Sequence, residues 1–181
     1  AIYYALSLVA TAAATDTTFT NQRKATAILN PLFQQQPQHP GLAHYIIHAN
    51  DSPRLARLGL DAARRYAGIA PAAPHAQHMP SHIFIRLGLW EDNIASNQRS
   101  FDAGMAHART QGWTGVAAHE FHALDYMVYG YLQLGQDGAA RRLVARADSL
   151  SAVEGRANLI AGYNGSALAA RVALERGDWR S

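Results

Sequence analysis

The sequence has no cysteine, one lysine and no long hydrophobic run, and each absence excludes a class of protein. Without cysteine there can be no disulfide, no thiolate metal ligand and no cysteine nucleophile. A helix that crosses a bilayer needs about 18 or more consecutive apolar residues, and the chain has no such run. We therefore expect no membrane span.

Charge is also scarce. Charged residues make up 16% of the 181 residues, and the net charge is +3 at pH 7. Seven of the 15 arginines lie on two predicted helices, at 53–69 and 137–150, without aromatic residues between them. A nucleic-acid surface combines a stronger positive field with interleaved aromatic side chains. We therefore do not expect nucleic-acid binding.

Strand signals are missing as well, because alternation of polar and apolar residues is not sustained anywhere. Hydrophobic residues make up 49% of the chain, which is enough for a sizeable core. Their spacing is helical, between short breaks of proline, glycine or aspartate. The pattern predicts an all-α protein with helices near 1–14, 19–35, 40–50, 53–69, 76–88, 91–111, 114–134, 137–150 and 153–176.

A short sequence motif centred on glycine recurs along the chain. Gly88, Gly135 and Gly177 each end a helical segment, each is followed within two residues by tryptophan or aspartate, and they are 47 and 42 residues apart. Such recurrence is typical of helical repeats. Because of this motif and of the segments 39–45 and 78–84, the chain resembles the tetratricopeptide-repeat (TPR) superfamily, and more narrowly a group of bacterial TPR proteins.

The resemblance implies one TPR-like domain over residues 1–181, an α-solenoid of stacked antiparallel helix hairpins. We expect about four hairpins, at 1–37, 38–74, 75–111 and 112–150, and a trailing helix at 153–176. The first helices, at 40–50, 76–88 and 114–134, would then line a concave groove. The resemblance also implies a bacterial source and an exported or periplasmic protein. We expect the chain to be a fragment of a longer one.

Six of the nine histidines lie on those three segments, and His75 directly precedes the second of them. Residues three or four apart share one face of a helix, and neutral imidazoles with a carboxylate form a common ligand set for transition metals. The candidate metal ligands are His44, His48, His78, His82, His119 and His122. His75 extends this stripe only if its segment is helical throughout, and Pro80 instead favours a helix start there.

The neighbouring carboxylates are candidates for a further ligand or for an orienting partner of a ligand. They are Asp51, Glu120 and Asp125. The segment from His119 to His122 does not match the zincin motif, which needs its histidines four apart. Without a metal, the same histidines would pack between hairpins or line an aqueous groove.

The sequence thus predicts a TPR-like scaffold that binds a protein or peptide partner, or a ligand, in a groove lined by histidine and tyrosine. Tyr45, Tyr126 and Tyr129 are the expected contacts, with or without a bound transition metal such as zinc, copper or iron. Two alternatives stay open: a metal-dependent enzyme, with Glu120 as the only candidate acid or base, and a structural unit that self-assembles end to end. No residue is assigned a catalytic role, and binding is favoured over catalysis.

Overall fold

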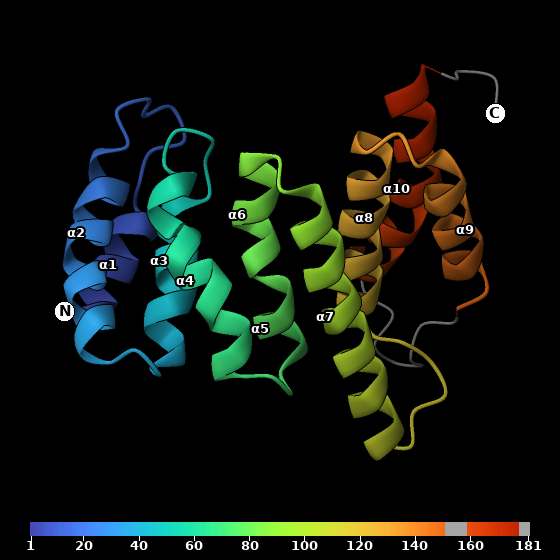
Figure 1. The fold of residues 1–181 in the computed structure, drawn as a ribbon, viewed down its shortest axis with the longest axis horizontal. Coiled ribbons are helices and arrows are strands. Elements are labelled where there is room, and N and C mark those ends of the chain that lie inside the picture. Colours follow the sequence, from blue (N-terminus) through green and yellow to red (C-terminus); the bar gives the residue numbers. More distant parts are fainter. Residues whose placement is uncertain (151–158, 178–181) are drawn as a thin grey trace.

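The chain is all-helical in a computed structural model that describes residues 1–150 and 159–177 (Figure 1). No β-strand occurs within these ranges, so the predicted all-α class is confirmed. None of the helices found there is both long and apolar enough to cross a bilayer. The helices are α1 (Ile2–Ala10), α2 (Thr20–Gln35), α3 (Pro40–Asn50), α4 (Ala56–Ile69), α5 (Pro74–His78), α6 (Pro80–Leu87), α7 (Trp90–Thr110), α8 (Ala118–Gln133), α9 (Asp137–Asp148) and α10 (Leu159–Arg176).

The helix expected at 76–88 is divided into α5 and α6, which corrects the prediction of a single helix. Pro80 has no N–H with which to bond the preceding turn, so the hydrogen-bond ladder is interrupted there. Met79 nevertheless keeps helical dihedrals, with φ −52° and ψ −36°. The histidines on both sides of the break therefore keep their helical spacing.

One further boundary differs from the prediction, and another lies outside the described residues. The first helix ends at Ala10 and not near residue 14, and there the Thr11 hydroxyl donates to the Ser7 carbonyl at 2.7 Å. Hydroxyl groups that bond the backbone compete with helix propagation. The expected helix at 153–176 corresponds to α10, and residues 153–158 lie outside the described ranges.

The recurring glycine motif lies at the C-terminal ends of helices. Gly88 and Gly135 take left-handed dihedrals, with φ 69° and 71°, directly after α6 and near the end of α8. Beyond Gly88, the Leu89 N–H donates to the Phe84 carbonyl at 2.9 Å, as in a Schellman cap. The repeat seen in the sequence is therefore a repeat of helix C-caps.

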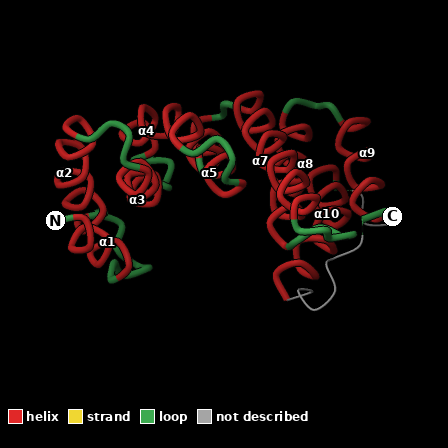
Figure 2. Tube along the Cα trace, turned by 90° about the horizontal axis from the view of Figure 1, so that it is seen from below, coloured by secondary structure: helices red, strands yellow, loops and turns green. Residues whose placement is uncertain are grey.

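Helices adjacent in sequence pack against each other, and Figure 1 shows a row that runs from the α1–α2 pair at one end to α8, α9 and α10 at the other. Figure 2 shows that the row is curved, with α1, α3 and α10 towards its inside and α2, α4 and α9 towards its outside. One buried hydrophobic cluster joins α1 to α6, and a second joins α7 to α10. One stripe of α8 is buried in the second cluster: Phe121, Leu124, Val128 and Leu132.

A polar seam joins the two clusters. On α7, the buried hydroxyls of Ser96 and Ser100 donate to the carbonyls of Gln77 and Pro74, at 2.5 and 2.8 Å. Buried polar groups stabilise a fold only when they are paired, and these are. The seam fixes α5 against α7 and so positions the histidines that α5 carries.

Candidate metal centre

Seven histidines gather where α3, α5, α6 and α8 meet, and ring centroids of neighbouring members lie between 4.6 and 6.4 Å apart. The cluster comprises His44, His48, His75, His78, His82, His119 and His122. The remaining two histidines have other roles. His39 caps α3, where its Nδ1 accepts the Leu42 N–H at 3.3 Å, and His107 packs edge-on against Trp113.

Three members form a compact group that we call the inner triad: His78, His82 and His122. Each offers one ring nitrogen such that the three nitrogens lie within 4.8 Å of one another. His78 is buried, with 1% of its surface exposed, and the other two are half-buried. Among the described residues this is the set with the geometry of a metal site.

A chain of hydrogen bonds fixes which nitrogen of His78 carries the proton. The Tyr126 carbonyl can only accept, so the Asn93 group 2.8 Å away is its amide NH₂. The Asn93 oxygen then accepts from the Asn97 NH₂ at 3.0 Å. The Asn97 oxygen in turn faces His78 Nδ1 at 2.6 Å, so Nδ1 must donate. The lone pair of neutral His78 is therefore on Nε2.

His82 is oriented by a carboxylate. Its Nδ1 lies 2.9 Å from Asp51 Oδ2, while Arg86 Nε donates to Asp51 Oδ1 at 2.8 Å. Burial opposes ionisation of Asp51, but the hydrogen bonds from His82 and Arg86 outweigh it and lower the pKa of that carboxyl. His82 therefore donates from Nδ1, and its Nε2 holds the lone pair when the ring is neutral.

The tautomers assigned to His78 and His82 place their two lone pairs opposite each other. His78 Nε2 and His82 Nε2 are 3.1 Å apart. Two lone pairs that face each other at this distance repel, so a positively charged species must lie between them: a proton or a metal ion. Histidine ligands to metals commonly donate their other N–H to a carboxylate or carbonyl, which is the arrangement found behind both rings.

A second group, which we call the outer triad, consists of His44, His48 and His75. His44 Nε2 lies 3.0 Å from His48 Nε2 and 3.1 Å from His75 Nε2. His48 and His75 are exposed, and His44 is half-buried. His75 was absent from the predicted ligands because Pro80 was expected to begin the helix, whereas α5 already presents it.

Desolvation in the cluster favours the neutral form of four of its rings, His44, His48, His75 and His78. Burial lowers the pKa of His44 and of His75 to about 4, and the neighbouring imidazoles add to the shift. Burial also lowers the pKa of His48, and it holds the pKa of His78 well below its ordinary value. Neutral imidazole is the form that binds metals.

His119 and Tyr126 flank the triads. The His119 ring lies 5.6 Å from that of His75 and 5.9 Å from that of His78, and its buried Nε2 has no hydrogen-bond partner among the described residues. Tyr126 packs 4.7 Å from His78 and 4.9 Å from His122. Burial and the Asp51 charge raise the pKa of Tyr126 to about 12, so it is a neutral phenol.

Of the three predicted carboxylates, Asp51 is the one that contacts the cluster. Asp125 accepts two bonds from Arg171, at 2.6 and 2.9 Å. The Glu120 carboxylate is buried against α7, where a Cβ at Gly104 would come within 1.8 Å of its Oε1. Neither Asp125 nor Glu120 is therefore placed as a partner of the histidines, which corrects the expectation for both.

The predicted tyrosines lie around the cluster. Tyr45 stacks on His44, with ring centroids 5.5 Å apart. Tyr126 and Tyr129 line a cavity of about 250 Å³ together with Arg86 and Arg171. This cavity adjoins the inner triad, because Tyr126 lines the cavity and packs against His78 and His122.

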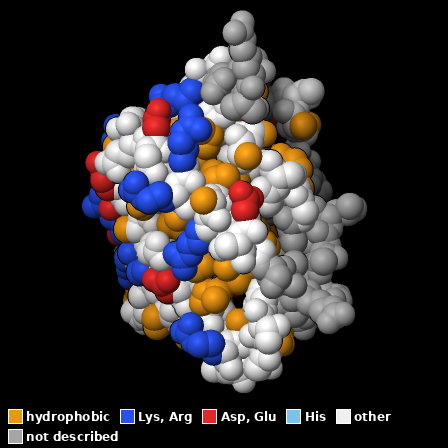
Figure 3. Space-filling model, turned by 90° about the vertical axis from the view of Figure 1, so that its right-hand side faces the viewer, with side chains coloured by type: hydrophobic (Ala, Val, Ile, Leu, Met, Phe, Trp, Pro, Cys, Tyr) orange, Lys and Arg blue, Asp and Glu red, His pale blue; other side chains and the backbone are white. Residues whose placement is uncertain are grey.

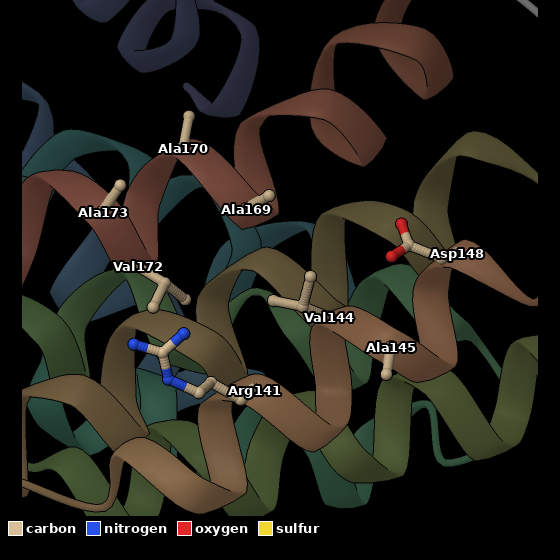
Figure 4. A pocket seen from close by; sticks show the side chains of 8 residues that line it. All are labelled: Arg141, Val144, Ala145, Asp148, Ala169, Ala170, Val172 and Ala173. Carbon is tan, nitrogen blue, oxygen red and sulfur yellow. The ribbon is translucent and has the colours of Figure 1, made fainter. Parts of the chain in front are cut away.

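An apolar groove lies elsewhere, between α9 and α10 (Figure 4). Its volume is about 380 Å³, and alanines and valines line most of it, with Arg141 and Asp148 among them. Figure 3 views this side of the molecule and shows hydrophobic side chains exposed between basic ones. It carries no histidine of the cluster. End-to-end assembly, expected from the sequence, stays a prediction.

Comparison of the chain with protein-family models, curated proteins and solved structures finds no match in any of the three. The TPR resemblance is therefore untested, and the argument for function rests on the residues of the site.

The sequence did not predict the two asparagines that orient the His78 ring. Asn93 and Asn97 are fully buried on α7, one helical turn apart. The available signal was the composition of that helix, because Asn93, Ser96, Asn97 and Ser100 form one stripe of small polar residues. Such a stripe also fits a solvent-exposed face, so the pattern alone does not show that it is buried.

Proposed function

We propose that this chain is a transition-metal-binding protein whose helical scaffold holds an ion at the inner triad. One observation carries the proposal. His78 Nε2 and His82 Nε2 face each other at 3.1 Å, while both Nδ1 atoms are committed as donors to Asn97 and Asp51.

The separation of the two nitrogens suits a metal as well as a proton, and the nearby third nitrogen favours the metal. With metal–nitrogen bonds of about 2.0–2.1 Å, two ligand nitrogens are roughly 2.9–3.3 Å apart at bond angles between right and tetrahedral. The observed 3.1 Å falls in this range. A proton also needs only two nitrogens, whereas the His122 nitrogen converges on the same place.

The donor set indicates the class of metal. Three neutral imidazoles suit zinc, copper, nickel and iron, and the absence of thiolate and of a directly placed carboxylate argues against calcium and magnesium. Three protein ligands leave at least one coordination position for water or a ligand.

The TPR-like superhelix belongs to this proposal as its scaffold. It is supported by the packing of sequence neighbours in chain order and by the glycine caps after α6 and α8. Histidines from α3, α5, α6 and α8 then meet because successive hairpins stack. In this proposal a protein or peptide partner binds next to the ion, in the groove lined by Tyr45, Tyr126 and Tyr129.

Elemental analysis of untagged protein, purified without a chelating resin, tests the proposal. We expect a stoichiometric transition metal, lost in His82→Gln and kept in His107→Gln, a matched substitution outside the cluster. Protein that is free of metal and gives no binding heat with Zn²⁺, Cu²⁺ or Ni²⁺ would overturn it. The cluster would then be a proton-sharing, packing element of a peptide groove.

A second candidate function, hydrolysis of a small anionic substrate, is favoured by the cavity beside the inner triad. Guanidinium groups bind carboxylates and phosphates, and Arg86 and Arg171 both line this space of about 250 Å³. Zinc held by three histidines brings the pKa of a bound water to about 7. Zinc-loaded protein should then hydrolyse para-nitrophenyl phosphate faster than metal-free protein, and Arg171→Gln should reduce the rate. Equal rates with and without zinc would exclude this activity for this ester.

A further inference from the structure

A separate cavity of about 340 Å³ lies where α4, α6 and α7 meet, and none of the described residues that line it is a histidine. Ala63 of α4 and Pro80 and Phe84 of α6 form an apolar part of its lining, and all three are buried. Small-molecule sites are mostly apolar cavities of about 300–1,000 Å³ that carry a few placed polar groups. This cavity therefore has the size for a small ligand.

One polar group at the cavity, the Arg99 guanidinium of α7, is held in place by a buried amide. Arg99 Nε donates to Gln77 Oε1 at 3.2 Å, and the Gln77 NH₂ donates to the Ala67 carbonyl at 2.8 Å. Gln77 is 4% exposed, so packing and this bond fix its orientation. Among the described residues, no acceptor is bonded to the two terminal nitrogens of Arg99, which are therefore available to a ligand.

A second guanidinium, that of Arg64 on α4, lines the same cavity. Arg64 Nη2 lies 3.9 Å from Asp92 Oδ2, which is too far for a hydrogen bond, and the two side chains are 61% and 51% exposed. Such an exposed ion pair contributes little to stability, so Arg64 can turn to another anion at small cost. Two arginines and one aspartate line the cavity, which gives it a net charge of +1.

We propose that this cavity binds a small monocarboxylate with an apolar body, such as an aromatic acid. The fork of a guanidinium matches a carboxylate with two parallel hydrogen bonds, and the apolar body would cover the buried alanine, proline and phenylalanine. A carboxylate suits the cavity better than a phosphate dianion does, because a dianion exceeds the charge of +1 and faces Asp92. The residues differ from those of the metal centre, so this inference does not depend on the proposed function.

NMR titration of ¹⁵N-labelled protein with benzoate at constant ionic strength tests the inference, because the Nε–H signal of each arginine reports on its guanidinium. We expect a saturable shift of the Arg99 Nε–H signal. Arg99→Gln should weaken binding by about tenfold, and Arg64→Gln by about two- to fivefold because that side chain is exposed. Arg57→Gln, an exposed arginine of α4 outside the cavity, should leave binding unchanged.

Melting temperatures show whether each variant folds. Arg99→Gln removes the donor that Gln77 accepts from, so Arg64→Gln provides the test if the first variant is unstable. Benzoate binding that is equal in wild type, Arg64→Gln and Arg57→Gln would contradict the inference, and so would the absence of any saturable shift in wild type.

Two comparison ligands separate the contributions of charge and of the apolar body. Benzamide has the shape of benzoate without its charge, and inorganic phosphate has charge without an apolar body. Both should bind more weakly than benzoate. Benzamide that binds as tightly would show an apolar cavity without anion recognition, and phosphate that binds as tightly would show a patch that selects charge alone. Either result would overturn the inference and leave the metal centre untouched.

Discussion

The inner and outer triads are made of the same residue type at the same spacing, and they differ in what lies behind the rings. His78 and His82 are four residues apart, as are His44 and His48. Behind the first pair stand a buried asparagine and an ion-paired carboxylate, whereas the second pair lies nearer to solvent. The comparison shows that spacing brings imidazoles together, and that their partners decide which nitrogen each ring presents.

The largest expected effect comes from removing an inner ligand. His82→Gln should weaken Zn²⁺ binding by more than about 100-fold, because loss of a ligand should exceed the 10–100-fold cost of losing an orienting partner. His78→Gln should act alike, and a thermal melt of the metal-free variant is needed because His78 is buried. Calorimetry measures both. Tight binding that survives both changes would place the ion elsewhere.

The second-largest effect is expected from Asp51→Asn, which removes the negative charge that orients His82. Asp51→Asn should weaken Zn²⁺ binding at the inner triad by about 10–100-fold, because His82 loses its carboxylate partner. Asp61→Asn, in an exposed pair with Arg65, is the matched control and should leave the affinity unchanged. Equal affinities of Asp51→Asn and Asp61→Asn would contradict the orienting role of Asp51.

A smaller effect should follow from a substitution at Gly130, which disturbs the hydrogen bonds of Asn93 and Asn97 without changing either residue. A Cβ at Gly130 would come within 2.7 Å of Asn93 Nδ2 and 2.9 Å of an Ile94 carbon. Gly130→Ala should therefore lower the free energy of unfolding by about 1–3 kcal/mol. It should also weaken the inner site by about tenfold, because His78 loses its fixed tautomer.

Gly68 on α4 provides the control for that substitution, because a Cβ there meets nothing within 4 Å. Gly68→Ala should stabilise the protein by up to about 1 kcal/mol and leave metal binding unchanged. Urea unfolding and Zn²⁺ calorimetry measure the two quantities. Full metal affinity in Gly130→Ala would contradict the role assigned to Asn93 and Asn97.

The smallest expected effect is on the acid stability of metal-free protein. The pKa of His44 and of His75 is about 4 in the folded chain, against an ordinary 6.5. Between these values the unfolded state binds more protons, so their contribution to stability is complete above pH 6.5 and is lost as pH falls towards 4.

Metal-free protein should therefore melt at a lower temperature at pH 5 than at pH 7.5, and solvent screening keeps the difference small because His75 is exposed and His44 is half-buried. Replacing His44 and His75 together by Gln should reduce the difference. Scanning calorimetry at the two pH values measures it. A Tm that does not change, or rises, on acidification would contradict the burial of neutral imidazoles.

Much of the fold could be predicted from the sequence. The glycine at 88 needs a left-handed conformation and so marks a helix end, and the stripe from Phe121 to Leu132 identifies a buried face. Pro80 was harder, because a proline can begin a helix or interrupt one, and the two readings place His75 differently. Packing of α5 against α7 decides between them, and that is a long-range property.

The candidate site could be predicted only in part. Helical spacing indicated the histidine pairs, since it depends on local geometry alone. The division into two triads could not be foreseen, because His122 joins His78 and His82 across 40 residues of chain. Asp51 was a candidate among three carboxylates, and only the packing distinguishes it from Asp125, which Arg171 binds.

The most direct test of the central claim is a crystal structure of zinc-loaded protein with anomalous data collected at the zinc absorption edge. We predict an anomalous peak within about 2.0–2.1 Å of both His78 Nε2 and His82 Nε2, with His122 as a third ligand and both Nδ1 atoms still bonded to Asn97 and Asp51. A map without a peak at this gap, with the two nitrogens remaining about 3 Å apart, would contradict the account and show a shared proton instead.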